Sequence, residues 1–125
     1  MKRDMDLVRE ILLAIEKCPE PVVWGYLEVE GFEPGPINAH LHLLNEAGYI
    51  RAAAAQDANT SYGYMMQDSS LTWAGYEFLD TIRDTEIWRL TKTGAEKVGV
   101  WGISMLVELA KGYARQKAIG LGLPL

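Results

Sequence analysis

The sequence predicts an α+β fold in which helices pack on a small antiparallel β-hairpin and an amphipathic helix follows near the C-terminal end. Apolar residues recur at helical spacing in four segments of the chain. Two stretches with the composition of strands flank a polar tip at residues 57–61, and prolines and glycines separate the segments. Because 125 residues are within the size of one domain, we expect a single domain with one core over 1–125.

Composition excludes several classes of protein. Apolar residues make up 49% of the chain and charged residues 23%, which is ordinary for a globular protein. Cys18 is the only cysteine, so an intramolecular disulfide is impossible, and the charged N-terminal segment is unlike a signal peptide. No apolar run approaches the roughly 18 residues of a membrane span. We therefore expect a cytoplasmic protein with no membrane role.

The first half of the chain divides at its prolines and glycines. A helix is expected over Asp4–Cys18, and Pro19 and Pro21 end it. The β-branched and aromatic run Val22–Glu30 predicts a short strand. After a turn at Gly31–Gly35, a second helix is expected over Pro36–Ala47, with Pro36 in its first position and Gly48 as a left-handed cap.

The outward face of this second helix follows from its buried stripe. Ile37, Leu41 and Leu44 define that stripe, with His40 at its margin. The residues left facing out are Asn38, Ala39, His42, Asn45 and Glu46.

A hairpin over about 49–72 is expected next. Its strands are Tyr49–Ala54 and Gly63–Leu71. Thr72 then caps a helix over Trp73–Arg83, whose inward residues are Gly75, Phe78, Leu79 and Ile82.

The last part of the chain has one clear helical pattern. Residues from Trp88 to Trp101 read as a weakly patterned link, and an amphipathic helix is expected over Ser104–Lys117. The tail 120–125 is expected to be docked or frayed. The predicted apolar side of the last helix consists of Leu106, Val107, Ala110, Tyr113 and Ala114.

Two sets of residues resemble known families. The spacing Ile37-x-x-His40-Leu41-x-x-Leu44-x-x-x-Gly48-x-Ile50 resembles the recognition-helix-to-wing signature of winged-helix repressors, and Leu71-Thr72-x-x-Gly75 resembles the usual exit from the wing. The uncharacterised bacterial and phage family known as domain of unknown function 2513 is similar over nearly the whole chain. That similarity is carried by Met1–Arg9, Gly31-Phe32, Leu71–Asp80, Ile82–Asp84 and Ile87-Trp88. The resemblance implies a winged-helix-like fold, often prophage-encoded, and supplies no activity and no catalytic residues. A phage-encoded protein would be expected in the host cytoplasm.

Charge is unevenly distributed along the chain. The net charge is −5, with 0 over residues 1–17, −9 over 18–88 and +4 over 89–125. A surface of one sign repels polyanions and attracts basic partners. We therefore expect a non-enzymatic regulatory or interaction protein that binds another protein through an acidic and aromatic surface. Its expected residues are Tyr62, Tyr64, Met65, Glu77, Asp80 and Asp84.

The alternative is a transcriptional regulator that binds duplex DNA through the helix 36–47 and the wing, as a homodimer formed by the C-terminal helix. Its DNA-contacting residues would be Asn38, Ala39, His42, Asn45 and Arg51. Of these, Arg51 alone has a fixed positive charge, whereas six to ten phosphate contacts are typical of a DNA-binding protein. A surface of different design could use the basic residues Arg89, Lys92, Lys97, Lys111, Arg115 and Lys117.

An enzyme ranks third. His40 and His42 are two residues apart and point to different faces of a helix, so they cannot share a metal ion. Cys18 is expected to be a half-buried structural thiol, and Glu77, Asp80 and Asp84 a solvated acidic face rather than a cation site. We expect no catalytic residues, no metal and no cofactor.

Overall fold

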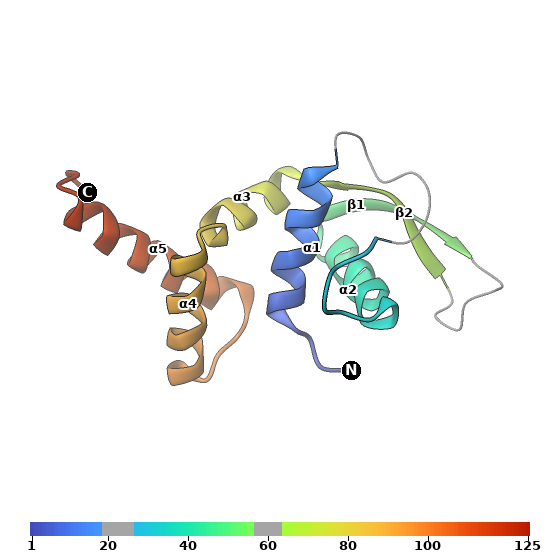
Figure 1. Cartoon of the computed structure of the whole chain (residues 1–125), viewed down its shortest axis with the longest axis horizontal. Helices are drawn as coiled ribbons and strands as arrows, with labels where there is room; N and C mark the ends of the chain where they lie inside the picture. The colour runs from blue at the N-terminus through green and yellow to red at the C-terminus, as the bar shows by residue number, and fades with distance from the viewer. Residues whose placement is uncertain (19–26, 57–63) are drawn as a thin grey trace. The chain divides into compact units, whose positions relative to one another are not determined.

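The computed structural model describes residues 1–18, 27–56 and 64–125, without the side chains of residues 53–56 and 64–68. The predicted α+β class is confirmed, because helices accompany a two-stranded antiparallel sheet within this part of the chain. The elements are α1 (Met5–Lys17), α2 (Pro34–Ala47), β1 (Ile50–Gln56), β2 (Tyr64–Leu71), α3 (Trp73–Ile82), α4 (Thr85–Val98) and α5 (Ile103–Gly120) (Figure 1).

The contacts divide the chain into two compact units. Unit 1 comprises residues 1–77 and unit 2 comprises residues 78–125, so the boundary falls inside α3. The single domain expected over 1–125 stays a prediction.

In unit 1, α1 begins and ends where the sequence predicts. The Oδ1 atom of Asp4 accepts hydrogen bonds from the backbone amides of Asp6 and Leu7, which is the geometry of an N-cap. Leu7, Ile11 and Ile15 are buried along one stripe of the helix. The packing of that stripe holds α1 against α2 and β2.

The strand expected at Val22–Glu30 is wrong for the part that can be described. Residues 27–29 have no regular structure, and a turn follows in which the amide of Phe32 donates to the carbonyl of Val29 (3.1 Å). Gly31 has a φ of +86° in this turn. Alternating residues form a strand only where they pair with another strand, and residues 27–29 do not, because β1 and β2 pair with each other alone among the described residues. Residues 22–26 lie outside the described part of the chain.

Helix α2 begins two residues earlier than predicted. Pro34 rather than Pro36 occupies the first position, and both prolines lie in the first turn, where their missing amides would have had no helical partner. The first helical bond joins the amide of Ile37 to the carbonyl of Glu33 (3.2 Å). At the other end the prediction for Gly48 is confirmed, because its φ is +84°.

The buried face of α2 is wider than the predicted stripe. Asn38, expected to face out, is buried, and His40, expected at the margin, is also buried. The physical reason is that α2 packs against α1 and against both strands, so neighbours cover it on more than one side. The outward face therefore contains fewer residues than the periodicity indicated.

The predicted hairpin is confirmed over its described residues. β1 pairs with β2 from Ile50 opposite Leu71 to Gln56 opposite Tyr64, and the register shifts between Arg51 and Ala53. At the shift Ala52 faces two residues of β2, as in a β-bulge. The predicted tip at 57–61 lies outside the description.

In unit 2, the predicted link at 88–101 is wrong, because α4 occupies Thr85–Val98. Its buried stripe includes Thr91 and Gly94 beside Ile87, Trp88 and Ala95. A polar and a small residue in that stripe remove the apolar periodicity by which the helix would have been found.

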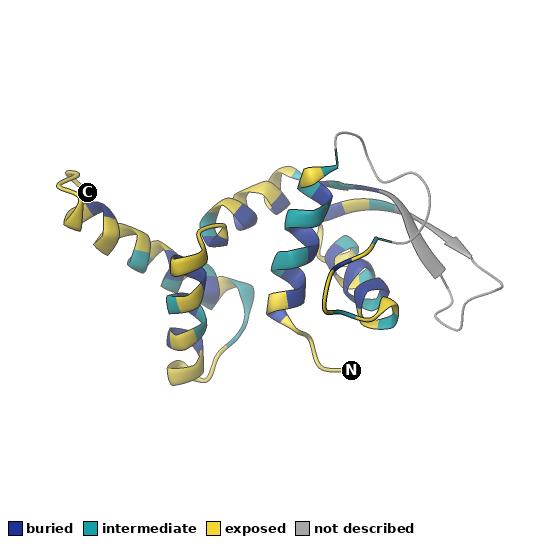
Figure 2. Ribbon diagram, in the orientation of Figure 1, coloured by how far each residue is buried: buried dark blue, intermediate teal, exposed yellow. Residues whose placement is uncertain are grey.

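Helix α5 is longer than the predicted Ser104–Lys117. Leu106 and Ala110 are buried as expected, whereas Ala114 is exposed. The helix closes at Gly122 (φ +82°), with the amide of Leu123 bonded to the carbonyl of Ala118 (2.9 Å). This is a Schellman closure, so the tail is hydrogen-bonded to the helix end. Its leucines are exposed (Figure 2).

Candidate protein-interaction surface

The start of α3 is fixed by a junction with the end of α2. The hydroxyl of Thr72 accepts the amide of Gly75 (3.1 Å) as an N-cap and donates to the carbonyl of Gly48 (2.6 Å). The amide of Thr72 also donates to the carbonyl of Tyr49 (3.1 Å). One side chain thus ties the first turn of α3 to the C-terminal end of α2.

Gly75 is required at this junction because α3 passes very close to the backbone of Tyr49. A Cβ atom on Gly75 would lie 2.0 Å from the carbonyl oxygen of Tyr49, which is a backbone atom and cannot move aside as a flexible side chain does. The sequence Leu71-Thr72-x-x-Gly75 therefore has a physical explanation, in which threonine caps the helix and glycine permits its close approach.

With Gly75 facing inward, the opposite face of α3 is open to solvent (Figure 2). Trp73 is 78% exposed and Tyr76 is 43% exposed, and Glu77 is also exposed. Residues three and four positions apart lie on the same face of a helix. We call Trp73, Tyr76 and Glu77 the aromatic-acidic patch, all of which belongs to unit 1.

The other acidic residues predicted to bind a partner already have structural roles. Asp80, in the unit 2 part of α3, is exposed and paired with Arg83 (2.8 Å). Asp84 caps α4, because its Oδ2 accepts the amide of Ile87 (2.9 Å), and its Oδ1 lies 3.6 Å from Nζ of Lys117. Both carboxylates thus pair within unit 2.

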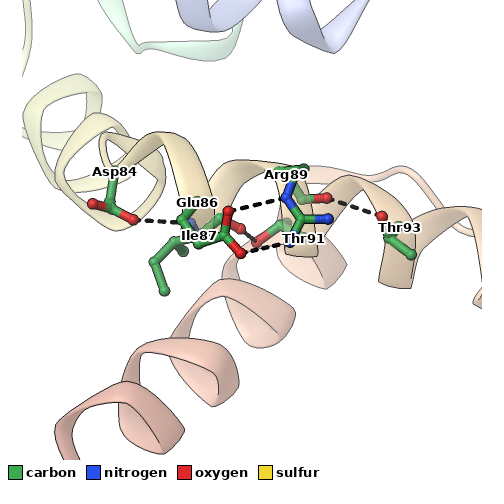
Figure 3. A network of polar contacts seen from close by, with 6 residues as sticks. All are labelled: Asp84, Glu86, Ile87, Arg89, Thr91 and Thr93. Carbon is green, nitrogen blue, oxygen red and sulfur yellow. Dashed lines mark hydrogen bonds and ion pairs between the residues drawn. The ribbon is translucent and has the colours of Figure 1, made fainter. Parts of the chain in front are cut away.

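The polar contacts at the start of α4 also lower the pKa of two carboxylates (Figure 3). The amide of Ile87, with help from Lys117, holds the pKa of Asp84 below its ordinary value. The hydrogen bond from Arg89 similarly lowers the pKa of Glu86. Further along the helix, Thr91 and Thr93 donate to the carbonyls of Ile87 and Arg89. The first turn of α4 is therefore a paired surface rather than an open acidic one.

The predicted wing residues can be placed only in part. Tyr62 lies outside the described residues, as do the side chains of Tyr64 and Met65. Their exposure stays a prediction.

Two of the residues predicted to contact DNA are buried or hydrogen-bonded within unit 1. Asn38 is buried, and the Oδ1 atom of Asn45 accepts the amide of Ala52 (3.2 Å) at the strand irregularity. Asn45 thus satisfies an amide where the ladder is interrupted. Ala39 and His42 are half-buried, and Arg51 is exposed.

The basic residues considered for a different DNA surface are partly engaged within unit 2. Arg89 is paired with Glu86 (2.5 Å), and Nζ of Lys92 lies 5.8 Å from the ring centroid of Trp88. Lys97, Lys111 and Arg115 are exposed.

His40 and Cys18 each make hydrogen bonds within the fold. The Nε2 atom of His40 accepts the amide of Asp4 (2.9 Å), and Nδ1 lies 2.7 Å from the carbonyl of Pro36. Cys18 is half-buried, and its thiol donates to the carbonyl of Ala14 (3.4 Å). No three His, Cys, Asp or Glu side chains come together as a metal site in the described ranges.

The described helices include none that is both long and apolar enough to cross a membrane.

Trp73 and Tyr76 are not among the residues that the sequence predicted for the binding surface. The helical periodicity indicates their exposure, because Gly75, Phe78 and Leu79 face inward and leave the positions between them facing out.

Comparison with known proteins identifies the family. A model of the family described as "Hypothetical protein (DUF2513)" matches residues 2–101, which is most of the chain. The chain belongs to the DUF2513 family. A protein of Haemophilus influenzae, described as "Uncharacterized protein", is 36% identical over 96 residues, covering 74% of this chain and 77% of its own. No solved structure matches the DUF2513 chain significantly.

Proposed function

We propose that this DUF2513 chain is a non-enzymatic, winged-helix-like interaction protein that binds another protein through the aromatic-acidic patch of α3. The observation that carries the proposal is the exposure of Trp73, at 78%, beside exposed Tyr76. Tryptophan and tyrosine are enriched at the centres of protein interfaces, where they bury a large area with few rotatable bonds.

The winged-helix part of the proposal rests on the order of elements in unit 1. Helix α2 leads through Gly48 into the β1–β2 hairpin, and the hairpin leads through Thr72 into α3. This order and the capping at both junctions agree with the resemblance in the sequence.

The charge of unit 1 indicates the class of partner. Residues 1–77 contain five Lys or Arg and twelve Asp or Glu, a net charge of −7. Such a unit attracts a partner surface that combines apolar and basic groups. Duplex DNA, the alternative partner, has less support, because Asn38 is buried and Asn45 is bonded to β1.

Site-specific photo-crosslinking in cells tests the proposal. A benzophenone amino acid replaces Tyr76, and the control carries it at Glu46, an exposed residue of α2 outside the patch. We expect a protein adduct from position 76 that is absent from position 46 and is lost when Trp73→Ala is added. No adduct at position 76, or equal adducts at both positions, would contradict the proposal.

The DNA alternative has its own measurement. Fluorescence anisotropy with random duplex DNA at low and physiological salt reports phosphate binding directly. We expect no binding at either salt concentration. Micromolar binding with a steep salt dependence would favour the regulator alternative instead.

A further inference from the structure

The C-terminal end of α5 forms an exposed apolar surface in unit 2. We call Ile119, Leu121, Leu123 and Leu125 the apolar tail; all four are exposed, with Leu121 at 70% and Leu125 at 74%. The backbone holds the turn in place, because the amides of Gly122 and Leu123 bond to the carbonyls of Ile119 and Ala118. Fixed apolar groups in water favour a partner that covers them.

The apolar tail lies in a basic segment. Residues 111–125 contain Lys111, Arg115 and Lys117 and no Asp or Glu. Lys111 and Arg115 are exposed, while Lys117 lies 3.6 Å from Asp84. The segment therefore combines exposed leucines with positive charge.

These properties complement the aromatic-acidic patch in unit 1. Leucine side chains pack well on the faces of Trp73 and Tyr76, and a guanidinium or ammonium group is attracted both to aromatic faces and to Glu77. Unit 1 carries a net charge of −7, opposite in sign to that of the tail segment.

We propose that the partner of the aromatic-acidic patch is a second copy of this chain, whose apolar tail docks on Trp73 and Tyr76. This inference rests on the proposed function and names its partner. Two such contacts related by a twofold axis close a dimer, whereas a single contact per pair builds longer chains.

Analytical ultracentrifugation of the full chain and two variants tests this proposal. The patch variant is Trp73→Ala with Tyr76→Ala, and the tail variant is Leu121→Ser with Leu125→Ser. All four side chains are exposed, so both variants should fold, which circular dichroism checks. We expect the wild type to self-associate and each variant to raise the dissociation constant at least about tenfold.

Mixing the variants identifies the mode of contact. The patch variant retains its tail and the tail variant retains its patch, so the mixture should associate more tightly than either variant alone. High salt should weaken wild-type association, because opposite charges attract across the contact. A tail-to-tail contact would show the reverse, since salt would screen the repulsion between two basic tails.

The outcomes separate this inference from the proposed function. A monomeric wild type, association that survives in the patch variant, or a mixture that does not associate would overturn the second-copy partner. An adduct at position 76 with a different protein would then still support the proposed function. If crosslinking at position 76 captures nothing, both proposals fail.

Discussion

His40 accepts a hydrogen bond from the backbone amide of Asp4, 36 residues earlier in the chain (2.9 Å). The carbonyl of Pro36 can only accept, so its contact with Nδ1 (2.7 Å) requires the hydrogen on Nδ1. Nε2 is then free of hydrogen and can accept the Asp4 amide. His40 thereby joins the start of α2 to the N-cap residue of α1.

We expect His40→Phe to lower the free energy of unfolding by about 2 kcal/mol, because it removes two hydrogen bonds while keeping a similar volume. Urea unfolding followed by circular dichroism measures the change. His40→Gln, which has an acceptor at a comparable distance, should recover part of the loss. Equal stability of His40→Phe and the wild type would contradict this role.

Replacing Gly75 by alanine should be severely destabilising. The new Cβ atom would lie 2.0 Å from the carbonyl oxygen of Tyr49, so α3 or the end of α2 must shift. We expect a loss of about 3 kcal/mol or more in urea unfolding. The matched control is Gly112→Ala in α5, where an added Cβ atom would meet nothing within 4 Å. Alanine there should raise the free energy of unfolding by up to about 1 kcal/mol. A Gly75→Ala protein as stable as the wild type would disprove the close approach.

The cap of α4 should make stability depend on pH in the acid range. The native pKa of Asp84 is lowered by the amide of Ile87, so its contribution is present above the unfolded value of 3.8 and is lost as pH falls below that value. Asp84→Asn retains an acceptor but does not titrate. We expect the melting temperature of the wild type to fall more than that of Asp84→Asn between neutral pH and about pH 3.

Glu86 titrates in the same direction because Arg89 lowers its pKa. Both proteins keep Glu86 and its hydrogen bond from Arg89, which is the main cause of the lowered pKa, although the charge of Asp84, which raises the pKa of Glu86, is lost in Asp84→Asn. An equal fall in melting temperature for the two proteins between neutral pH and about pH 3 would argue against the role of Asp84.

The effects on stability of substitutions at Gly94 in α4 and at Tyr113 in α5 should be coupled. A Cβ atom on Gly94 would lie 2.9 Å from the hydroxyl of Tyr113. Gly94→Ala therefore sets a gain in helix propensity against a steric contact. We expect Tyr113→Phe to relieve that contact, so that a double-mutant cycle gives a favourable coupling of about 0.5–1 kcal/mol. Additive effects in thermal unfolding would show that the hydroxyl does not limit Gly94.

Much of the local structure could be predicted from neighbouring residues. The proline break after α1, the left-handed cap at Gly48 and the cap at Thr72 each depend on a few consecutive residues. The inward face of α3 was predicted for the same reason. The outward positions of Trp73 and Tyr76 follow from the same periodicity.

The predictions that were wrong for α2 concern burial and hydrogen bonding, which depend on residues far apart in the sequence. Asn38 and His40 are buried because α1 and the hairpin both cover α2, and Asn45 is engaged because the strand register shifts beside Ala52. Helix α4 escaped prediction because Thr91 and Gly94 lie in its buried stripe.

The sequence by itself therefore determined the caps at Gly48 and Thr72, the hairpin and the uneven charge. The tertiary structure decided which polar side chains are buried, among them Asn38, His40 and Thr91. The physical reason is that a cap or turn is closed by bonds between nearby residues, whereas burial depends on which distant elements pack together.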